Sequence, residues 1–271
     1  MVDHKEKFFE DWQEAKNHFT EFPHNWIFRG QGNINWRLET SLERAAFQGW
    51  DNKREKGFIE EFKRGAQNYL NPQDIPQTLA EWLSLMQHHG APTRFLDFTL
   101  SPYIASYFAF EEDISSESVI WAINANYFRK ESSKLFFEHF PEKKENGRIK
   151  LEDIVPNLID RNNLTCAFPL EPTRQNRRYL IQQSVFMCLG STIDTFEESL
   201  DSFEKASNNV EKIVLKNDLR GKALYDLDQM NISRESLFLN LEGFAQSLTT
   251  YFDTLFSYMI PFDRMRNFKR D

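Results

Sequence analysis

The stretch from 83 to 110, which reads LSLMQHHGAPTRFLDFTLSPYIASYFAF, places the strongest constraint on what this chain can fold into. It holds two adjacent histidines, a Gly–Ala–Pro turn, an arginine, an aspartate and a threonine between strongly apolar segments. Such polar and ionisable residues are expected where a strand ends, a site opens and a helix begins. The shorter stretch 26–31, WIFRGQ, has the same character, and we expect it to face the first.

Length, charge and cysteine content limit the classes of protein. A chain of 271 residues is within the reach of one core with insertions. The net charge of −8 argues against broad binding of nucleic acid or of an anionic membrane. Cys166 and Cys188 have no metal-ligand spacing and make no disulfide framework. The charged start and the lack of a long apolar run favour a cytoplasmic protein.

Apolar periodicity predicts a mixture of helices and strands in one domain over 1–271. We expect helices over 6–20, 54–70, 78–88, 218–230 and 233–256, with two more starting at 41 and 101. We expect strands over 26–28, 93–99, 119–125, 164–172, 178–190 and 210–216. The charged segment 126–161 is predicted to be a partly helical insertion on the surface. Because the elements do not alternate as βαβ units, the pattern indicates an α+β fold.

Arg29 is the first candidate ligand-binding residue. It follows three apolar residues and precedes Gly30, where backbone can approach a ligand closely, and Gln31 comes next. A guanidinium at a strand end suits phosphate or carboxylate, which it can bind bidentately. An internal salt bridge is the alternative role for Arg29.

The histidine pair is the second candidate. His88 and His89 would point about 100° apart on a helix, so they cannot chelate one metal ion together. The other histidines are scattered, and no metal site is predicted. One of the pair is expected to be a buried, hydrogen-bonded residue at a helix end. The other, for which we select His89, is expected to be an acid or base in the site.

Three polar residues follow in the predicted strand. Arg94 and Asp97 are three apart and so should face opposite sides of a strand, which favours two separate roles. We include both in the candidate site, with Asp97 as an acid or base or as the group that orients Arg29 or a histidine. Thr99 is expected to cap the next helix or to contact a ribose.

Two residues of the helix that follows complete this group. Ser101 has the same alternatives as the threonine before it, capping or ribose contact. Tyr107 is expected either in the core or stacked on a ligand ring. The chain contains no G-x-x-x-x-G-K-[ST], G-x-G-x-x-G or G-x-S-x-G motif.

Four segments together resemble the FRG domain family, which is named for a Phe-Arg-Gly triplet. They are WIFRGQ, MQHHGAPTRFLDFTLSPYIASYFAF, NRRYLIQQSVF and ESLFLNLEGFAQSL, and they span 26–248 in the order of the family. The triplet is Phe28, Arg29 and Gly30. This sequence departs from the family pattern at Phe98, where tryptophan is usual, and at Ser184, where glycine is usual.

A weaker similarity to ADP-ribosyltransferases of the Arg–Ser–Glu type implies a split antiparallel sheet with inserted helices. In this similarity Arg29 corresponds to the arginine of the Arg–Ser–Glu motif, and Thr99 or Ser101 corresponds to its serine hydroxyl. Gln182 or Gln183 stands where the glutamate should be, and we place Gln183 in the catalytic set. A neutral amide loses the charge that stabilises an oxocarbenium-like transition state. Another acid, Asp97 or Glu171, would then have to supply it.

The resemblance implies a nucleotide-directed enzyme, with NAD as candidate substrate and no tightly bound cofactor. Such a protein would be an NAD-consuming transferase or hydrolase that acts as a bacterial toxin or phage-defence effector, with a protein target as one outcome. The alternative is a module that binds a nucleotide or a partner protein without turnover. A nuclease that uses the histidine pair is a third alternative, and it would need a basic surface.

Overall fold

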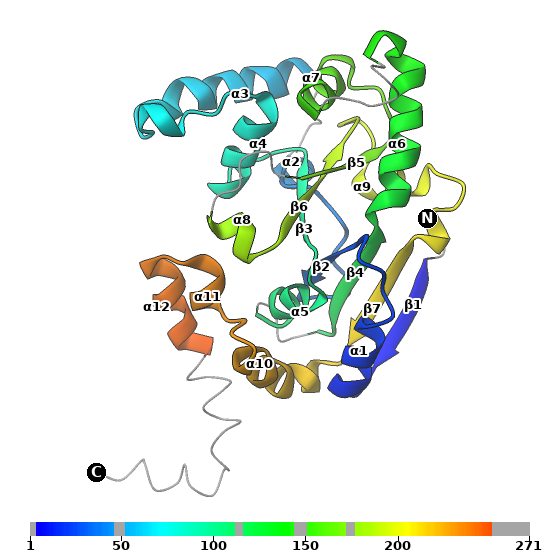
Figure 1. Ribbon diagram of the computed structural model, residues 1–271, viewed down its shortest axis with the longest axis vertical. Helices are drawn as coiled ribbons and strands as arrows, with labels where there is room; N and C mark the ends of the chain where they lie inside the picture. The colour runs from blue at the N-terminus through cyan, green and yellow to red at the C-terminus, as the bar shows by residue number, and fades with distance from the viewer. Residues whose placement is uncertain (1–3, 46–51, 112–115, 144–150, 172–176, 251–271) are drawn as a thin grey trace, which may run out of the picture.

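The computed structural model describes residues 4–45, 52–111, 116–143, 151–171 and 177–250. They form an α+β domain built on a seven-stranded mixed sheet with the strand order β1-β7-β4-β2-β3-β6-β5 (Figure 1). The strands are β1 Lys5–Phe9, β2 Trp26–Gln31, β3 Phe95–Thr99, β4 Ser118–Asn124, β5 Ala167–Leu170, β6 Ser184–Leu189 and β7 Val210–Leu215.

The sheet is split between β2 and β3. β2 pairs with β4 through six residue pairs, and β3 pairs with β6 through five. Between β2 and β3 the register contains one pair, Phe28 with Thr99. The two strands diverge beyond that pair, so they form a wedge with its vertex at Phe28 and Thr99.

All neighbouring strands are antiparallel except β1 and β7, which are parallel. The expected antiparallel sheet is therefore wrong at this edge. The helix expected over 6–20 also differs, because its first residues belong to β1. Asp11 instead caps a helix that starts at Trp12, because its carboxylate accepts hydrogen bonds from the backbone N–H groups of Gln13 and Glu14 at 2.7 and 3.1 Å. The preceding residues extend along β7.

Twelve α-helices lie within the described residues. They are α1 Trp12–Phe19, α2 Ser41–Ala45, α3 Asn52–Ala66, α4 Leu79–His88, α5 Pro102–Glu111, α6 Ala125–His139, α7 Leu151–Arg161, α8 Arg177–Ile181, α9 Phe196–Asp201, α10 Arg220–Gln229, α11 Arg234–Phe238 and α12 Leu241–Thr250. Figure 1 shows α3, α4 and α7 gathered at one end of the molecule and α1, α5 and α10 at the other.

The helix and strand around the polar motif form as the sequence predicts. Thr78 and Glu81 make a capping box at the start of α4. The helix ends before Gly90, whose φ of +77° is readily adopted by glycine. β3 and α5 both begin within fifteen residues of the end of α4, and only a short turn before Pro102 separates them. The polar motif is thus confined between three buried elements.

The helices pack on the two faces of the sheet in different arrangements. One face is continuous across both half-sheets, and α9 and the start of α6 pack on it. The opposite face is divided. Over β2, β4 and β7 it is covered by α1, α5 and α10, whereas over β3, β5 and β6 it is covered by α3, α4, α6 and α7. Helix α5 of the first group and α4 of the second both contribute residues to the space at the wedge.

Segment 126–161 was expected to be a surface insertion, and its described residues are instead part of the core. Phe128 and Phe136 of α6 and Val155 and Leu158 of α7 have no exposed surface. The two helices present apolar faces that the high charge of the segment concealed from sequence analysis. Residues 144–150 lie outside the described part of the chain.

Two further elements differ from the expected ones. The strand predicted over 178–190 begins only at Ser184, because α8 occupies the first residues and Gln183 has a φ of +48°. The helix predicted over 233–256 is divided into α11 and α12 at Leu239, which has a φ of +41°. Its residues 251–256 lie outside the described part. Among the described helices, none is long and apolar enough to cross a membrane.

Candidate functional site

A pocket of about 700 Å³ lies in the wedge between β2 and β3. It reaches from the vertex of the wedge to the segment that follows β2, with α4, α5 and α8 contributing to its walls. Its lining residues are Phe28, Arg29, Gly30, Gln31, Asn35, Trp36, Arg37, Glu39, Arg44, Gln87, His88, Asp97, Phe98, Thr99, Ala105, Phe108, Arg178, Tyr179, Gln182 and Ser184. Pockets of this size suit small-molecule ligands.

Arg29 crosses the wedge. Its Nη1 donates a hydrogen bond of 2.9 Å to the backbone carbonyl of Asp97 on the other strand. In a continuous ladder Gly30 would lie opposite Asp97, but the strands have already diverged there. The half-buried carbonyl of Asp97 has no strand partner on this side, and the guanidinium replaces the missing N–H. The same cation lines the pocket.

Gly30 lets α5 approach β2. A Cβ atom at this position would lie 1.9 Å from the carbonyl oxygen of Ala105 and 2.6 Å from the amide nitrogen of Ala109. Both are backbone atoms of a helix that is packed in the core, so they cannot move aside easily. The absence of a side chain at Gly30 therefore sets the position of the α5 wall.

Asp97 is held by a chain of side-chain hydrogen bonds from α4. Gln87 Nε2 donates to Asp97 Oδ2 at 2.6 Å, and Gln87 Oε1 accepts from the hydroxyl of Thr93. This network fixes the carboxylate at the pocket. Thr99 is 5% exposed and its hydroxyl donates to the backbone carbonyl of Gln182 at 2.7 Å. Its oxygen also accepts from the backbone N–H of Ser101, so the hydroxyl has a structural role.

The α8 side of the pocket carries a second cation. Arg178 is half-buried, and within the described parts of the chain its guanidinium has no hydrogen bond or ion pair. It lies over the ring of Phe238, with Cζ 4.6 Å from the ring centroid. Burial lowers the pKa of Arg178 from its ordinary value, and the nearby carboxylate of Asp97 opposes that shift.

His88 at the end of α4 is the histidine of the pair that lines the pocket. Its Nδ1 is buried without a hydrogen-bond partner in the described structure. Burial, together with the charges of Arg178 and His89, lowers the pKa of His88 to about 4. The imidazole is therefore neutral at neutral pH, and the fixed positive charge on this side of the pocket comes from Arg178.

Segment 33–45 forms the outer wall at the open end of the wedge. Trp36 is 43% exposed there, and it makes no ring contact with the described residues. Gln31 anchors the start of this segment, because its Nε2 donates to the carbonyl of Arg37 at 3.0 Å while its Oε1 accepts from Trp121 Nε1 at 2.7 Å.

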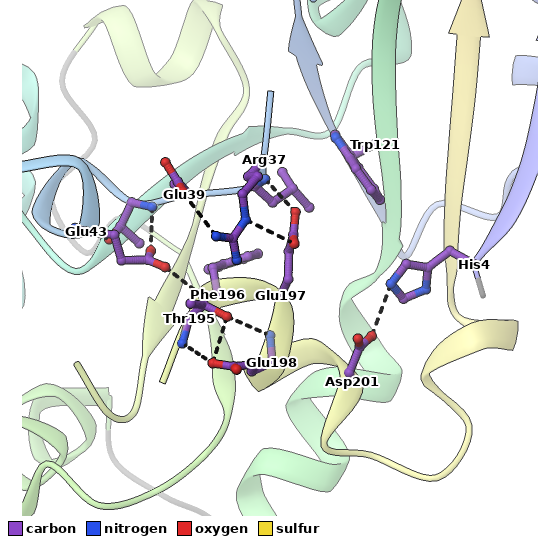
Figure 2. Close-up of polar contacts among 12 residues, drawn as sticks. His4, Arg37, Glu39, Glu43, Trp121, Thr195, Phe196, Glu197, Glu198 and Asp201 are labelled. Carbon is purple, nitrogen blue, oxygen red and sulfur yellow. Dashed lines mark hydrogen bonds and ion pairs between the residues drawn. The ribbon is translucent and has the colours of Figure 1, made fainter. Parts of the chain in front are cut away.

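Carboxylates fix the rest of this wall (Figure 2). Glu197 accepts from the backbone N–H of Leu38 at 3.0 Å and lies 3.5 Å from Nε of Arg37. Glu43 accepts from the backbone N–H groups of Thr40 and Phe196 at 2.6 and 2.8 Å. Burial raises the pKa of Glu43, and these hydrogen bonds oppose the shift. The wall is thereby tied to the start of α9.

The structure brings five of the predicted site residues to the pocket, namely Arg29, Gly30, Gln31, Asp97 and Thr99. Arg94 and Asp97 have different partners, as their spacing suggested: Asp97 accepts from Gln87, and Arg94 pairs with Glu55. Arg94, placed in the ligand site from sequence, lies instead just before β3, outside the pocket lining and with no exposed surface.

Arg94 is part of a buried network. It forms an ion pair with Glu55 of α3, in which Nε donates at 2.7 Å, and it donates to the carbonyl of Leu189 at 2.8 Å and to Asn162 at 3.1 Å. These contacts join β3 to β6, α3 and the end of α7. Arg94 cannot meet a ligand in the pocket, and its role is structural.

Four other predicted residues also lie outside the pocket. His89 is exposed beyond the end of α4, and Gln183 is exposed at the turn before β6. Ser101 Oγ accepts from the backbone N–H of Ile104 at 3.3 Å, which makes it a helix cap. Tyr107 is buried and donates to Glu111 at 3.0 Å. Burial raises its pKa.

Sequence reasoning missed several lining residues. His88 stands next to His89, which was selected, and only the direction of the two side chains separates them. Gln87 and Trp36 line the pocket without any adjacent residue having been selected. Arg178 and Tyr179 were placed in a strand, so their approach to the pocket from a helix could not be foreseen. No group of three or more histidine, cysteine, aspartate or glutamate residues in the described ranges is arranged to hold a metal ion.

The comparison with protein families identifies the part of the chain that carries most of this site. Residues 24–118 match the FRG domain. All the lining residues except Arg178, Tyr179, Gln182 and Ser184 lie in the matched segment. No curated protein matches the chain, and no solved structure matches it. The expected likeness to ADP-ribosyltransferases therefore has no support from these comparisons.

The structure gives each residue of the triplet in the FRG domain a physical role. Phe28 packs in the core and forms the one register pair that joins the half-sheets. Arg29 supplies the hydrogen bond that spans the wedge. Gly30 admits the α5 backbone. The triplet of the FRG domain thus builds the vertex of the pocket and one of its walls.

Proposed function

We propose that the pocket binds a nucleotide of the NAD class and that the protein breaks the bond between its ribose and the nicotinamide. Water, or a nucleophile of a target protein, then forms the new bond to the ribose carbon and gives up its proton. The observation that carries the proposal is the meeting of Arg29, Arg178 and Asp97 in one pocket from two diverging strands and a helix. Two arginines suit a pyrophosphate, since guanidinium groups bind phosphate bidentately. The volume of about 700 Å³ is in the range of small-molecule sites.

Aromatic side chains support a ligand with a planar base. Trp36 lies at the open end of the wedge, and Phe108 and Tyr179 line the walls. Stacking of a base on an aromatic ring contributes about 1–3 kcal/mol. We assign the base nearest the opening to Trp36, because that ring is exposed and has a free face.

Asp97 is the acid that this proposal requires. The glutamines at the position expected for a glutamate do not supply it, since Gln183 lies outside the pocket and Gln182 Nε2 donates to the carbonyl of Leu237 at 3.1 Å. Glu171 is also outside and pairs with Arg129. Asp97 is fixed by Gln87 at 2.6 Å. Its negative charge would stabilise the positive charge that develops on the ribose as neutral nicotinamide leaves.

A second candidate function is binding of the same nucleotide without turnover. It is favoured by the presence of Arg178 in the same pocket, because its positive charge would oppose the positive charge that develops on the ribose. Consumption of NAD would suit a toxin or defence effector, whereas binding alone would suit a sensor.

The experiment that tests the proposal measures both binding and nicotinamide release with NAD in excess. The expected result is saturable binding and release by the wild type, with release lost and binding retained in Asp97→Asn. Binding without release would select the sensor. No binding of NAD at millimolar concentration would overturn both functions.

A further inference from the structure

The guanidinium of Arg178 is held in the pocket by an aromatic ring rather than by a carboxylate. An arginine side chain has many rotamers, and ordering it costs conformational entropy. Within the described structure no hydrogen bond fixes Arg178, and its one specific contact is with the ring of Phe238 in α11, 4.6 Å from Cζ to the centroid. Its donors therefore remain available to a ligand.

Phe238 is itself fixed from two sides. The ring of Phe108 lies edge-on to it at 6.1 Å, and the guanidinium of Arg234 lies over it at 4.5 Å. Arg234 is neutralised by an ion pair with Glu111, which also accepts from Tyr107. Of the two arginines on the ring, only Arg178 lacks a carboxylate partner among the described residues.

Helix α11 is also tied directly to α8. Gln182 Nε2 donates to the carbonyl of Leu237 at 3.1 Å, and Leu237 is 2% exposed in the core. This hydrogen bond attaches the residue before Phe238 to the residue that follows α8, the helix that carries Arg178. α11 lies outside the segment that matches the FRG domain, so the pocket depends on a part of the chain beyond that match.

We propose that Phe238 is the positioning residue that presents the Arg178 guanidinium to an anionic group of the ligand. Its face orients the planar cation, and the bound phosphate takes the donors that no protein acceptor uses. This inference rests on the proposed function only in taking the ligand to be phosphate-bearing.

The test compares Phe238→Leu, which keeps apolar volume without a π face, with Phe238→Tyr, which keeps the face. Affinities for NAD, inorganic pyrophosphate and adenosine are measured by calorimetry on the full chain. A cation–π contact of about 1 kcal/mol predicts a roughly fivefold loss for NAD and pyrophosphate in Phe238→Leu. Phe238→Tyr and the affinity for adenosine should stay within about twofold of wild type.

A double-mutant cycle separates positioning from general damage to the fold. Arg178→Ala should lose pyrophosphate affinity, and adding Phe238→Leu to it should cause no further loss, because the oriented group is absent. Additive losses, or equal losses for adenosine, would overturn the inference. If Phe238→Leu unfolds, Arg178→Lys serves instead, since it keeps the charge without the planar stack. Affinity equal to wild type in Arg178→Lys would then overturn the inference, and a roughly fivefold loss would support it.

The pyrophosphate measurements distinguish this inference from the proposed function. Wild type that binds pyrophosphate with the expected differences but does not bind NAD would refute the proposed function and support the role of Phe238. Normal binding and turnover of NAD, with no effect of Phe238→Leu on affinity, would support the proposed function and refute the role of Phe238. Failure to bind either compound would refute both.

Discussion

Nη1 of Arg29 donates a 2.9 Å hydrogen bond to the backbone carbonyl of Asp97, across the point where the two half-sheets separate. This bond joins the strands where the ladder between them has ended. An arginine that lines the pocket is therefore also one that joins the two strands bounding it. Ligand binding and stability are linked at Arg29, and mutations there must be tested for both.

Replacement of Arg29 by alanine should abolish binding of NAD and also lower the free energy of unfolding. The half-buried carbonyl of Asp97 loses a charged donor, and a hydrogen bond to a charged group contributes about 1.5–3 kcal/mol. Calorimetry with NAD and urea denaturation measure the two effects. Arg64→Ala is the matched control, because Arg64 is exposed on α3. Full NAD affinity in Arg29→Ala would restrict Arg29 to a structural role.

Replacement of Gly30 by alanine should destabilise the protein by several kcal/mol. The new methyl group would lie 1.9 Å from the carbonyl oxygen of Ala105, so the α5 backbone would have to move. Gly57→Ala in α3 is the control, because a Cβ there meets nothing within 4 Å. That substitution should raise helix stability by up to about 1 kcal/mol. Equal melting temperatures for the two variants would contradict this account.

Replacement of Arg94 by methionine should lower the free energy of unfolding by about 3–5 kcal/mol, because it leaves the carboxylate of Glu55 buried without its partner. The comparison is Arg129→Met, which breaks the exposed pair with Glu171 and should cost about 0–1 kcal/mol. Urea denaturation measures both. The Arg94→Met variant should retain its affinity for NAD wherever it is folded, and a selective loss of affinity would return Arg94 to the binding site.

The stability of the protein should fall with acidification partly through His88. The pKa of His88 is lowered to about 4 in the folded state, against an ordinary value of about 6.5. The unfolded chain therefore binds a proton between about pH 6.5 and 4 that the folded chain does not, and stability decreases as pH falls through this window. The slope from this group is at most about 1.4 kcal/mol per pH unit.

Urea midpoints measured from pH 7 to pH 4 test this linkage. In His88→Asn the loss of stability over that window should be smaller than in the wild type. His139→Asn, which removes an exposed histidine of α6, should keep the wild-type loss. Identical pH profiles for His88→Asn and the wild type would show that the imidazole titrates normally in the folded protein.

Replacement of Trp36 by alanine should weaken NAD binding without unfolding the protein. The ring is 43% exposed, so little core packing is lost, while a stacked base would lose about 1–3 kcal/mol. Trp36→Phe keeps a stacking face and should retain most of the affinity. Pyrophosphate, which has no base, should bind the wild type and Trp36→Ala equally. A similar loss of affinity for pyrophosphate would assign Trp36 to the structure of the wall.

The sequence alone determined the local features of the site. The triplet at Phe28, the capping box at Thr78 and the glycine at position 90 each depend on neighbouring residues, and so they could be read in order along the chain. The alternation of side chains along a strand favoured separate roles for Arg94 and Asp97, although β3 begins only at Phe95. The mixed α+β character followed in the same way from periodicity.

Only the tertiary structure decided which of these residues share a pocket. The divergence of β2 from β3 selects His88 over His89 and brings Arg178 from α8 to Asp97, because strand separation and helix packing are set by residues far apart in sequence. The pairing of Arg94 with Glu55 depends in the same way on where α3 packs. Side-chain chemistry is encoded locally, whereas the partner of each side chain is fixed by long-range packing of the core.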